Sequence, residues 1–200
     1  SIFKNTYKLE SGAYLSWDGH RVEKKVFWEL SFKPKVKVFN KSLEALDKAL
    51  LSSVEDRLVS DVPIGVFLSG GLDSSTVAYY ATKTGKGKIK TFSIGFKEGS
   101  FDESSFAREV AKYLGTEHYE KILSIQDSIE LVSKIGESMD EPMADSSILP
   151  TYLLSQFARE HVTVALGGDG GDELFCGYDT FMAHRLASVY EKIPKIIRTK

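Results

Sequence analysis

Two short stretches of the sequence gather residue types that bind phosphate and divalent cations. Residues 69–75 read SGGLDSS, and residues 167–173 read GGDGGDE. Adjacent glycines let a backbone turn sharply and approach a ligand closely, and serine hydroxyls hydrogen-bond phosphate oxygens. Carboxylates repel phosphate unless a cation such as Mg²⁺ lies between them. The residue types therefore predict a site for a phosphate ester bound together with magnesium.

The first stretch fits neither of the two common phosphate-loop patterns. A P-loop needs the pattern GxxxxGK[ST], and a dinucleotide loop needs GxGxxG, whereas this stretch has no lysine and its spacing is too short. The N–H groups and the dipole of a helix that begins near Asp73 favour an anion, with Ser69, Ser74 and Ser75 as added donors. Asp73 is then a candidate magnesium ligand. The alternative is a plain strand-to-helix turn in which Asp73 or Ser74 caps the helix.

The second stretch carries three acids, Asp169, Asp172 and Glu173, on a glycine-rich backbone. Crowded carboxylates are costly unless a cation or a proton offsets their charge. Together with Asp73 they form a plausible magnesium site. The alternative is a solvated acidic turn, because surface loops are often acidic.

Strands and helices alternate from Pro63 onward. Strands are expected over 63–69, 88–96, 116–123 and 162–168. Helices are expected over 73–83, 102–115 with Gly115 as its C-terminal stop, 124–139 and 151–160, and from about Asp179, with a polar loop over 140–150. This order predicts an α/β fold, a doubly wound parallel sheet with helices on both faces. Ligands of such sheets bind at the carboxyl ends of the strands, where both glycine-rich stretches lie.

The first 62 residues have a different pattern. Two short strands around a turn at Asp18-Gly19 are expected within residues 13–30. A helix is expected over 40–60, because leucine and valine recur there at helical spacing. Asn40 or Ser42 is the expected N-cap of this helix.

Composition excludes several classes of protein. The 200 residues are 42% hydrophobic and 27% charged, with a net charge of −2, and no basic tract suggests nucleic-acid binding. No apolar run is long enough to cross a membrane, and the first residues do not resemble a signal peptide. A single cysteine, Cys176, excludes an internal disulfide, favours the cytoplasm, and is interpreted as a small packing residue.

The segment LSGGLDSS resembles the pyrophosphate-binding loop of the N-type, or PP-loop, ATP pyrophosphatases, whose fold is adenine nucleotide alpha hydrolase-like. In that family the loop holds the β- and γ-phosphates while the α–β bond breaks. Three further segments are similar to the synthetase domain of the glutamine-hydrolysing asparagine synthetase family: FDESSFAREVAKYLGTEHYE, DEPMADSSILPTYLLSQFARE and GGDGGDELFCGY. The resemblance implies that residues 40–200 are a C-terminally truncated synthetase domain. Residues 1–39 then resemble the end of a glutaminase domain and its linker.

The resemblance implies a role for each matching position. Leu68 and Ile94 would line the adenine site, and Gly167 and Gly168 would pass beneath the nucleotide. The residues that would hold pyrophosphate are Ser69, Gly70, Gly71, Ser74 and Ser75. Asp73 and Asp172 would bind magnesium. Asp169 stands where the family has an acid linked to the acyl-adenylate, although many relatives carry the longer Glu there.

The segment 140–147 is a candidate wall for the carboxylic-acid substrate. Asp140, Glu141 and Asp145 either contact the α-ammonium group of that substrate or only cap the next helix. The sequence leaves both interpretations open.

The implied function is synthesis of asparagine from aspartate and ATP through β-aspartyl-AMP, with release of AMP and pyrophosphate. Magnesium is the implied cofactor, and ammonia would come from glutamine through a glutaminase domain of the parent chain. One alternative is an amidotransferase or β-lactam synthetase-like enzyme that adenylates another acid. A second is a nucleotide-binding sensor, against which the acids Asp73, Asp169 and Asp172 argue. No nucleic-acid or membrane partner is expected, and the oligomeric state stays open, a homodimer included.

The two ends of the chain depart from the family pattern. The family's glutaminase nucleophile is an N-terminal cysteine, whereas this chain begins with Ser1, and the chain ends at Lys200 without the family's helical C-terminal portion. We therefore expect these 200 residues alone to bind ATP weakly and to turn over poorly.

Overall fold

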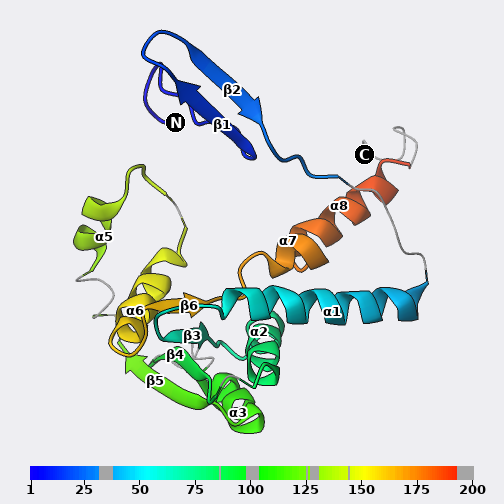
Figure 1. Ribbon diagram of the computed structural model, residues 1–200, viewed down its shortest axis with the longest axis vertical. Coiled ribbons are helices and arrows are strands. Elements are labelled where there is room, and N and C mark those ends of the chain that lie inside the picture. Colours follow the sequence, from blue (N-terminus) through cyan, green and yellow to red (C-terminus); the bar gives the residue numbers. More distant parts are fainter. Residues whose placement is uncertain are drawn as a thin grey trace, which may run out of the picture.

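The computed structural model describes residues 1–31, 38–85, 87–97, 104–124, 126, 131–143 and 145–192. A four-stranded parallel sheet forms its centre (Figure 1). The strands of this sheet are β3 (Ile64–Phe67), β4 (Lys90–Phe96), β5 (Glu117–Leu123) and β6 (Val164–Leu166). The central strand β3 is short and wholly apolar, as expected for a strand that is covered on both faces, whereas the edge strand β5 (EHYEKIL) carries charged residues.

The order of the strands creates a single switch point. The order is β5-β4-β3-β6, so the chain moves outward from β3 through β4 to β5 and then returns to the other side of β3. β3 and β6 pair in parallel, with Val66 opposite Leu166. The carboxyl ends of β3 and β6 therefore lie side by side, and each leads into one of the two glycine-rich stretches.

Helices cover both faces of the sheet. One hydrophobic core contains Val66 of β3 and Leu68, which directly follows this strand, together with residues of α1 (Phe39–Arg57), α2 (Leu72–Lys83) and α3 (Ser104–Leu114). The other core contains Phe92 with Phe67 and residues of α6 (Ile148–Arg159). Since successive strand residues point to opposite faces, Phe67 and its neighbours Val66 and Leu68 enter different cores. The predicted doubly wound α/β fold is confirmed.

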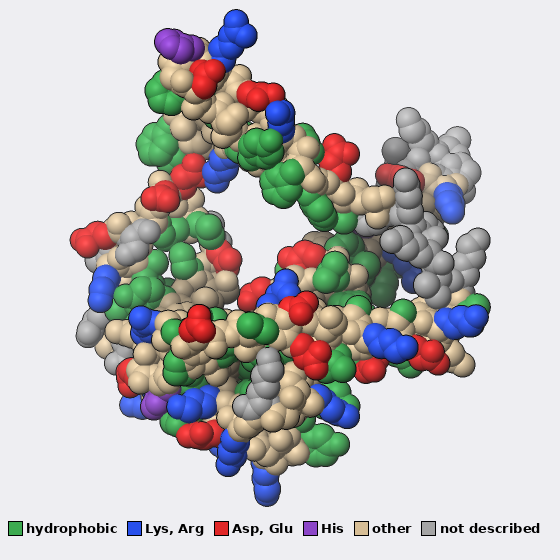
Figure 2. Space-filling model, in the orientation of Figure 1, with side chains coloured by type: hydrophobic (Ala, Val, Ile, Leu, Met, Phe, Trp, Pro, Cys, Tyr) green, Lys and Arg blue, Asp and Glu red, His purple; other side chains and the backbone are tan. Residues whose placement is uncertain are grey.

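The remaining elements lie around this unit. They are the antiparallel strands β1 (Ala13–Trp17) and β2 (Val22–Val26), and the helices α5 (Val132–Ser138), α7 (Gly171–Phe175) and α8 (Asp179–Tyr190). The predicted hairpin is confirmed, and Asp18 Oδ1 accepts hydrogen bonds from the backbone N–H groups of His20 and Arg21 in its turn. Figure 1 shows the hairpin away from the sheet, and Figure 2 shows hydrophobic side chains exposed along it. Within the described ranges, every helix is too short or too polar to cross a membrane.

The predicted cap of the first long helix is wrong. α1 begins at Phe39, its N-cap is Val38, and no side chain caps it. Asn40 and Ser42 therefore both lie inside the first turn. From there the Ser42 hydroxyl donates to the carbonyl of Val38, four residues back, as serines inside helices often do.

Three predictions for residues 148–176 also need correction. α6 begins at Ile148 instead of residue 151, because Pro150 fits the first turn of a helix, where no N–H donor is needed. Residues 171–175 form the short helix α7, whereas their glycine-rich sequence predicts a loop. Cys176 is exposed and follows α7 with φ +59°, so it is not a packing residue. Within the predicted helix 124–139, the structure gives α5 over Val132–Ser138, and residues 125 and 127–130 lie outside the described residues.

Candidate active site at the sheet switch point

The two glycine-rich loops touch each other at the switch point. A Cβ atom added to Gly168 would lie 2.8 Å from the backbone nitrogen of Ser74 and 3.0 Å from Asp73 Cβ. A Cβ atom added to Gly171 would overlap the carboxylate of Asp73, 2.8 Å from its Oδ1. Real Cβ atoms do not approach backbone this closely, so glycine at position 168 lets the loops meet, whereas a side chain at position 171 would displace the Asp73 carboxylate.

The loop after β3 is folded around its serines. The Ser69 N–H donates to Ser74 Oγ over 3.2 Å, the two hydroxyl oxygens lie 3.0 Å apart, and the Gly71 N–H donates to Ser69 Oγ. Helix α2 begins after Gly71 without a side-chain cap, so neither Asp73 nor Ser74 caps it. Ser75 Oγ is buried without a hydrogen-bond partner among the described residues. The loop thus keeps donors available for an anion at a helix N-terminus.

A cavity of about 990 Å³ opens beyond the carboxyl ends of β3, β4 and β6. Most of the predicted site residues line it: Leu68, Ser69, Asp73, Ser74, Ile94, Gly167, Gly168, Asp169 and Asp172. Gly70, Gly71 and Ser75 do not. Gly70 instead turns the chain at φ +85° against the first turns of α3, where a Cβ atom would lie 2.6 Å from the Ala107 nitrogen.

The cavity lining contains both polar and apolar side chains. Ser69, Ser74, Asp73 and Asp172 come from the two loops that meet. The apolar lining residues are Leu68, Ile94, Phe96, Leu149, Pro150 and Leu154. A site with apolar walls and a few placed polar groups suits a ligand with a flat base at one end and phosphates at the other.

The acids of the second loop occupy distinct positions. Asp169 is exposed, and its carboxylate folds back over Gly167. The Asp172 carboxylate lies against Gly177. The Tyr178 hydroxyl donates to Glu173 Oε1 over 2.8 Å, and this bond raises the pKa of Tyr178. Glu173 and Tyr178 both line the cavity.

The donor set fits magnesium carried by a nucleotide. Among the residues that the structure describes, no three or more His, Cys, Asp or Glu side chains cluster as a self-sufficient metal site. Asp73 and Asp172, however, line the same cavity beside the serine-rich loop. Magnesium is commonly held by one or two carboxylates plus substrate phosphates and water. Two carboxylates next to a phosphate loop are therefore enough.

Of the predicted substrate wall, residues 140–147, the acids Asp140, Glu141 and Asp145 do not line the cavity. Asp140 is exposed, and Glu141 forms a 2.7 Å ion pair with Lys8, whose ammonium group lowers the pKa of Glu141. Asp145 Oδ1 accepts the N–H of Ser147 over 2.9 Å, which lowers the pKa of Asp145. Ser147 is the N-cap of α6, and no side chain caps this helix. The neighbouring hydroxyl residues Ser146 and Ser147 line the cavity instead.

Sequence reasoning missed one group of cavity residues. Ser93 and Ser104 line the cavity although they are only 3% and 2% exposed. A signal was present for Ser93, because it is a polar residue inside the otherwise apolar run FSIGF of β4. A polar side chain buried inside a parallel strand is a reason to look for a ligand near it.

Comparison with known proteins gives consistent matches. Residues 45–199 match the family model described as asparagine synthase. The chain is 43% identical to a putative glutamine-hydrolyzing asparagine synthetase 2 from Methanocaldococcus jannaschii, over 99% of this chain and 39% of that protein. It is 38% identical to the glutamine-hydrolyzing asparagine synthetase 1 of Bacillus subtilis, over 85% of this chain and 27% of that protein. The chain thus spans about two fifths or less of these relatives. A solved NMN synthetase from Francisella tularensis is similar over 68% of this chain and 58% of that one, with a TM-score of 0.46 and 22% identity.

Proposed function

The chain belongs to the asparagine synthase family, and we propose that it forms the ATP-dependent synthetase unit of an asparagine synthetase. In this proposal the side-chain carboxylate of aspartate attacks the α-phosphorus of ATP, and pyrophosphate leaves. Ammonia then displaces AMP from β-aspartyl-AMP to give asparagine. The observation that carries the proposal is the contact of Gly168 and Gly171 with Asp73 and Ser74, which joins a phosphate loop to an acidic loop.

The residues that line the cavity support one orientation of ATP. The adenine ring would lie against Leu68 and Ile94, with Gly167 and Gly168 beneath the nucleotide. The triphosphate would then reach the serine-rich loop and the N-terminus of α2, where Ser69 and Ser74 donate hydrogen bonds. The buried Ser75 hydroxyl, which has no partner among the described residues, would be a further hydrogen-bond donor of this loop to the phosphates. Positioning of this kind and charge stabilisation account for most of the catalysis in phosphoryl and nucleotidyl transfer.

Asp73 and Asp172 would hold the magnesium ion. When bound, the ion offsets the negative charge that develops on the leaving pyrophosphate. Asp73 also has a fixed position, because Gly171 packs against its carboxylate and Gly168 against its backbone. Asp169 is exposed and lines the cavity, and in this proposal it would act on the reacting carboxylate rather than on the base.

The names of the relatives support a proposal for the nitrogen source and for the neighbouring domain of the parent protein. Their names describe glutamine-hydrolyzing enzymes, so we propose that ammonia comes from a glutaminase domain in the same protein. Residues 1–39 would belong to the end of that domain and its linker, and residues 40–200 to the synthetase unit. The single cysteine supports a cytoplasmic location.

The test uses the longest natural polypeptide that contains these 200 residues. It is incubated with ATP, Mg²⁺, ammonia and one candidate acid at a time, and the products are identified by mass. AMP, pyrophosphate and asparagine that depend on aspartate are the expected result. ADP as product, or bound ATP without turnover, would contradict the proposal.

The same experiment decides between the proposal and its alternatives. AMP formed with an acid other than aspartate would keep the adenylating chemistry and reassign the substrate, as in an amidotransferase or a β-lactam synthetase-like enzyme. ATP binding that needs neither magnesium nor an acid would favour a nucleotide sensor.

A further inference from the structure

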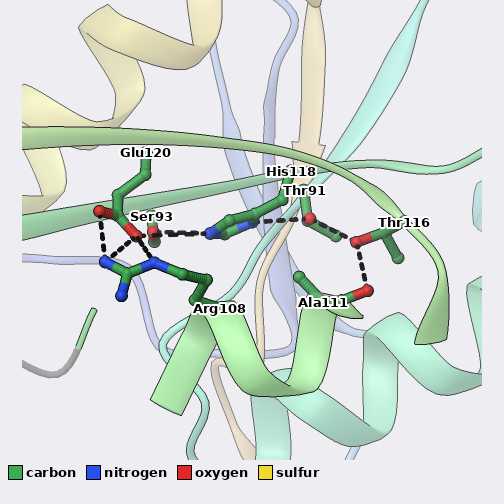
Figure 3. Close-up of polar contacts among 7 residues, drawn as sticks. All are labelled: Thr91, Ser93, Arg108, Ala111, Thr116, His118 and Glu120. Carbon is green, nitrogen blue, oxygen red and sulfur yellow. Dashed lines mark hydrogen bonds and ion pairs between the residues drawn. The ribbon is translucent and has the colours of Figure 1, made fainter. Parts of the chain in front are cut away.

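A chain of hydrogen bonds runs behind the cavity wall, between β4, β5 and α3 (Figure 3). It starts at Ser93 on β4, which lines the cavity beside Ile94 and is 3% exposed. Ser93 Oγ lies 3.2 Å from Nε2 of His118 on β5, and His118 Nδ1 lies 3.0 Å from Thr91 Oγ1. The roles proposed above for the cavity residues use neither Ser93 nor His118.

The last hydrogen bond of this series, at Thr116, determines which group donates in each of the others. Thr91 Oγ1 lies 2.8 Å from Thr116 Oγ1, and the Thr116 hydroxyl donates to the backbone carbonyl of Ala111 over 3.5 Å. A carbonyl oxygen only accepts, so the Thr116 proton points to Ala111 and Thr116 accepts the proton of Thr91. Thr91 must then accept from His118 Nδ1–H. His118 Nε2 is left as an acceptor, and the proton that it accepts is that of the Ser93 hydroxyl.

The charged neighbours of His118 permit this tautomer. Glu120 lies on the same strand, with its Oε2 4.0 Å from His118 Nε2, too far for a hydrogen bond. Arg108 of α3 engages both Glu120 oxygens over 2.8–3.2 Å and so holds that carboxylate away from the ring. Burial lowers the pKa of His118, and the positive charge of Arg108 acts in the same direction while Glu120 opposes it. The ring is therefore neutral at pH 7, as the chain requires.

We propose that Ser93 selects adenine among the purine bases, and that the chain through His118, Thr91 and Thr116 fixes Ser93 as a hydrogen-bond acceptor. A hydroxyl whose proton is committed to His118 offers only lone pairs to the cavity. The exocyclic amino group of adenine is a donor and pairs with such an oxygen. The 6-oxo group of guanine or hypoxanthine is an acceptor and is repelled by it. This inference rests on the proposed function, since it assumes a nucleotide base beside Ile94 in the cavity.

Ser93 can discriminate between bases because a buried polar group is stable only when it has a hydrogen-bond partner. Thr91 and Ser93 are almost inaccessible to water, so their hydroxyls depend on protein or ligand partners. A buried site built to pair with a substrate N–H discriminates strongly against an analogue that lacks it. Ser93 therefore adds specificity at the base without touching the reacting phosphates.

Equilibrium binding of three nucleotides tests the role of Ser93. ATP, purine riboside triphosphate (which lacks the amino group) and inosine triphosphate are titrated into the longest natural polypeptide that contains this chain. Wild-type protein should bind ATP about three- to tenfold more tightly than purine riboside triphosphate, the range of one neutral hydrogen bond. Ser93→Ala should reduce this ratio to less than about twofold with the affinity for purine riboside triphosphate kept. Ser93→Thr, which keeps the hydroxyl, should restore it. An unchanged ratio in Ser93→Ala would overturn the proposal.

A second measurement tests the chain without any nucleotide. The ¹⁵N chemical shifts of the His118 ring distinguish its tautomers, and His118→Gln identifies its signals. The wild-type ring should carry its proton on Nδ1. Thr116→Val removes the acceptor for the Thr91 proton, so it should move the proton to Nε2 and lower the preference for ATP over inosine triphosphate. Thr84→Val, which removes a hydroxyl that donates to the Ala81 carbonyl far from the cavity, should change neither.

The two measurements separate failure of this inference from failure of the proposed function. A wild-type ring protonated on Nε2 overturns the inference even if ATP binds and reacts. A protein that binds none of the three nucleotides overturns the proposed function and, with it, the role of Ser93 at the base.

Discussion

At the scale of single residues, Asp73 is the side chain on which the proposed site depends most. It lines the cavity, and two glycines of the second loop pack against it. Asp73→Asn keeps the shape and the packing but removes the negative charge. We expect ATP affinity in the presence of Mg²⁺ to fall at least about tenfold, with little change in thermal stability, because an amide is a poor magnesium ligand.

The measurement is calorimetric titration with ATP, with and without Mg²⁺. Asp61→Asn is the matched control, because Asp61 is exposed and lies before β3, outside the cavity lining. Equal magnesium dependence in the wild type and in Asp73→Asn would remove Asp73 from the proposed metal site.

His118 gives a prediction about pH and stability. Burial lowers its pKa in the folded protein below the ordinary value of 6.5. Between these two pKa values the unfolded chain binds more protons, so the free energy of unfolding should decrease as the pH falls below about 6.5. The decrease should stop below the folded pKa, and one proton contributes at most about 1.4 kcal/mol per pH unit.

Urea denaturation between pH 5 and 8 measures this slope. His118→Gln should lower stability at pH 7, because it breaks the contacts to Ser93 and Thr91, yet it should flatten the part of the slope that this histidine contributes. Parallel pH profiles for the wild type and the variant would show that His118 titrates alike in both states.

At the scale of elements, β4 carries the core on the α6 face of the sheet. Phe92 is fully buried and has ring contacts with Tyr119, Phe157 and His161 at centroid distances of 5.3, 6.0 and 5.7 Å. Phe92→Ala should lower the free energy of unfolding by about 3–5 kcal/mol, because it removes apolar burial and leaves a cavity.

Urea denaturation measures the cost, with Tyr113→Ala as the control. Tyr113 lies on α3 and is 87% exposed, so its truncation should change stability by less than about 0.5 kcal/mol. Similar midpoints for both variants would mean that the α6 face contributes little to the cooperative core.

The elements were predictable from sequence wherever one local signal decided them. Helix α3 ends at Leu114 because Gly115 takes φ +69°, as its position after the apolar pattern indicated. The start of α1 was missed because capping residues stood just inside it, and the structure caps it with no side chain. α7 was missed because glycines at 170 and 171 indicate loop, and only the tertiary contact of Gly171 with Asp73 explains why it lies where it does.

At the scale of the whole molecule, the place of the site can be predicted from the strand order. The residues that surround it depend on tertiary contacts, which the sequence does not indicate. The two glycine-rich loops are distant in sequence, but both follow parallel strands, and such strands end at one edge of the sheet. The acids of the predicted substrate wall are an example of such tertiary contacts. Glu141 pairs with Lys8 near the other end of the chain, a partner that no local pattern of residues 140–147 could indicate.

The hairpin segment 1–31 is the part of the molecule that contributes least to the α/β unit. Neither hydrophobic core contains a described residue from this segment. Its link to the rest, among the described ion pairs, is the one between Lys8 and Glu141, and the Lys8 side chain is 72% exposed. Exposed ion pairs contribute about 0–1 kcal/mol, and two-stranded hairpins are marginal on their own. The hairpin should therefore unfold independently of the sheet.

Both tryptophans of the chain, Trp17 and Trp28, lie in this segment, so two spectroscopic signals report on different parts of the molecule. On heating, tryptophan fluorescence should change at lower temperature than far-UV circular dichroism, which follows the helices. Deleting residues 1–31 should move the circular dichroism midpoint by less than about 4 °C, the shift that about 1 kcal/mol produces in a chain of this size. Glu141→Gln should reproduce any small shift. Coincident transitions, or a loss of more than about 10 °C on deletion, would mean instead that the hairpin and the sheet fold as one cooperative unit.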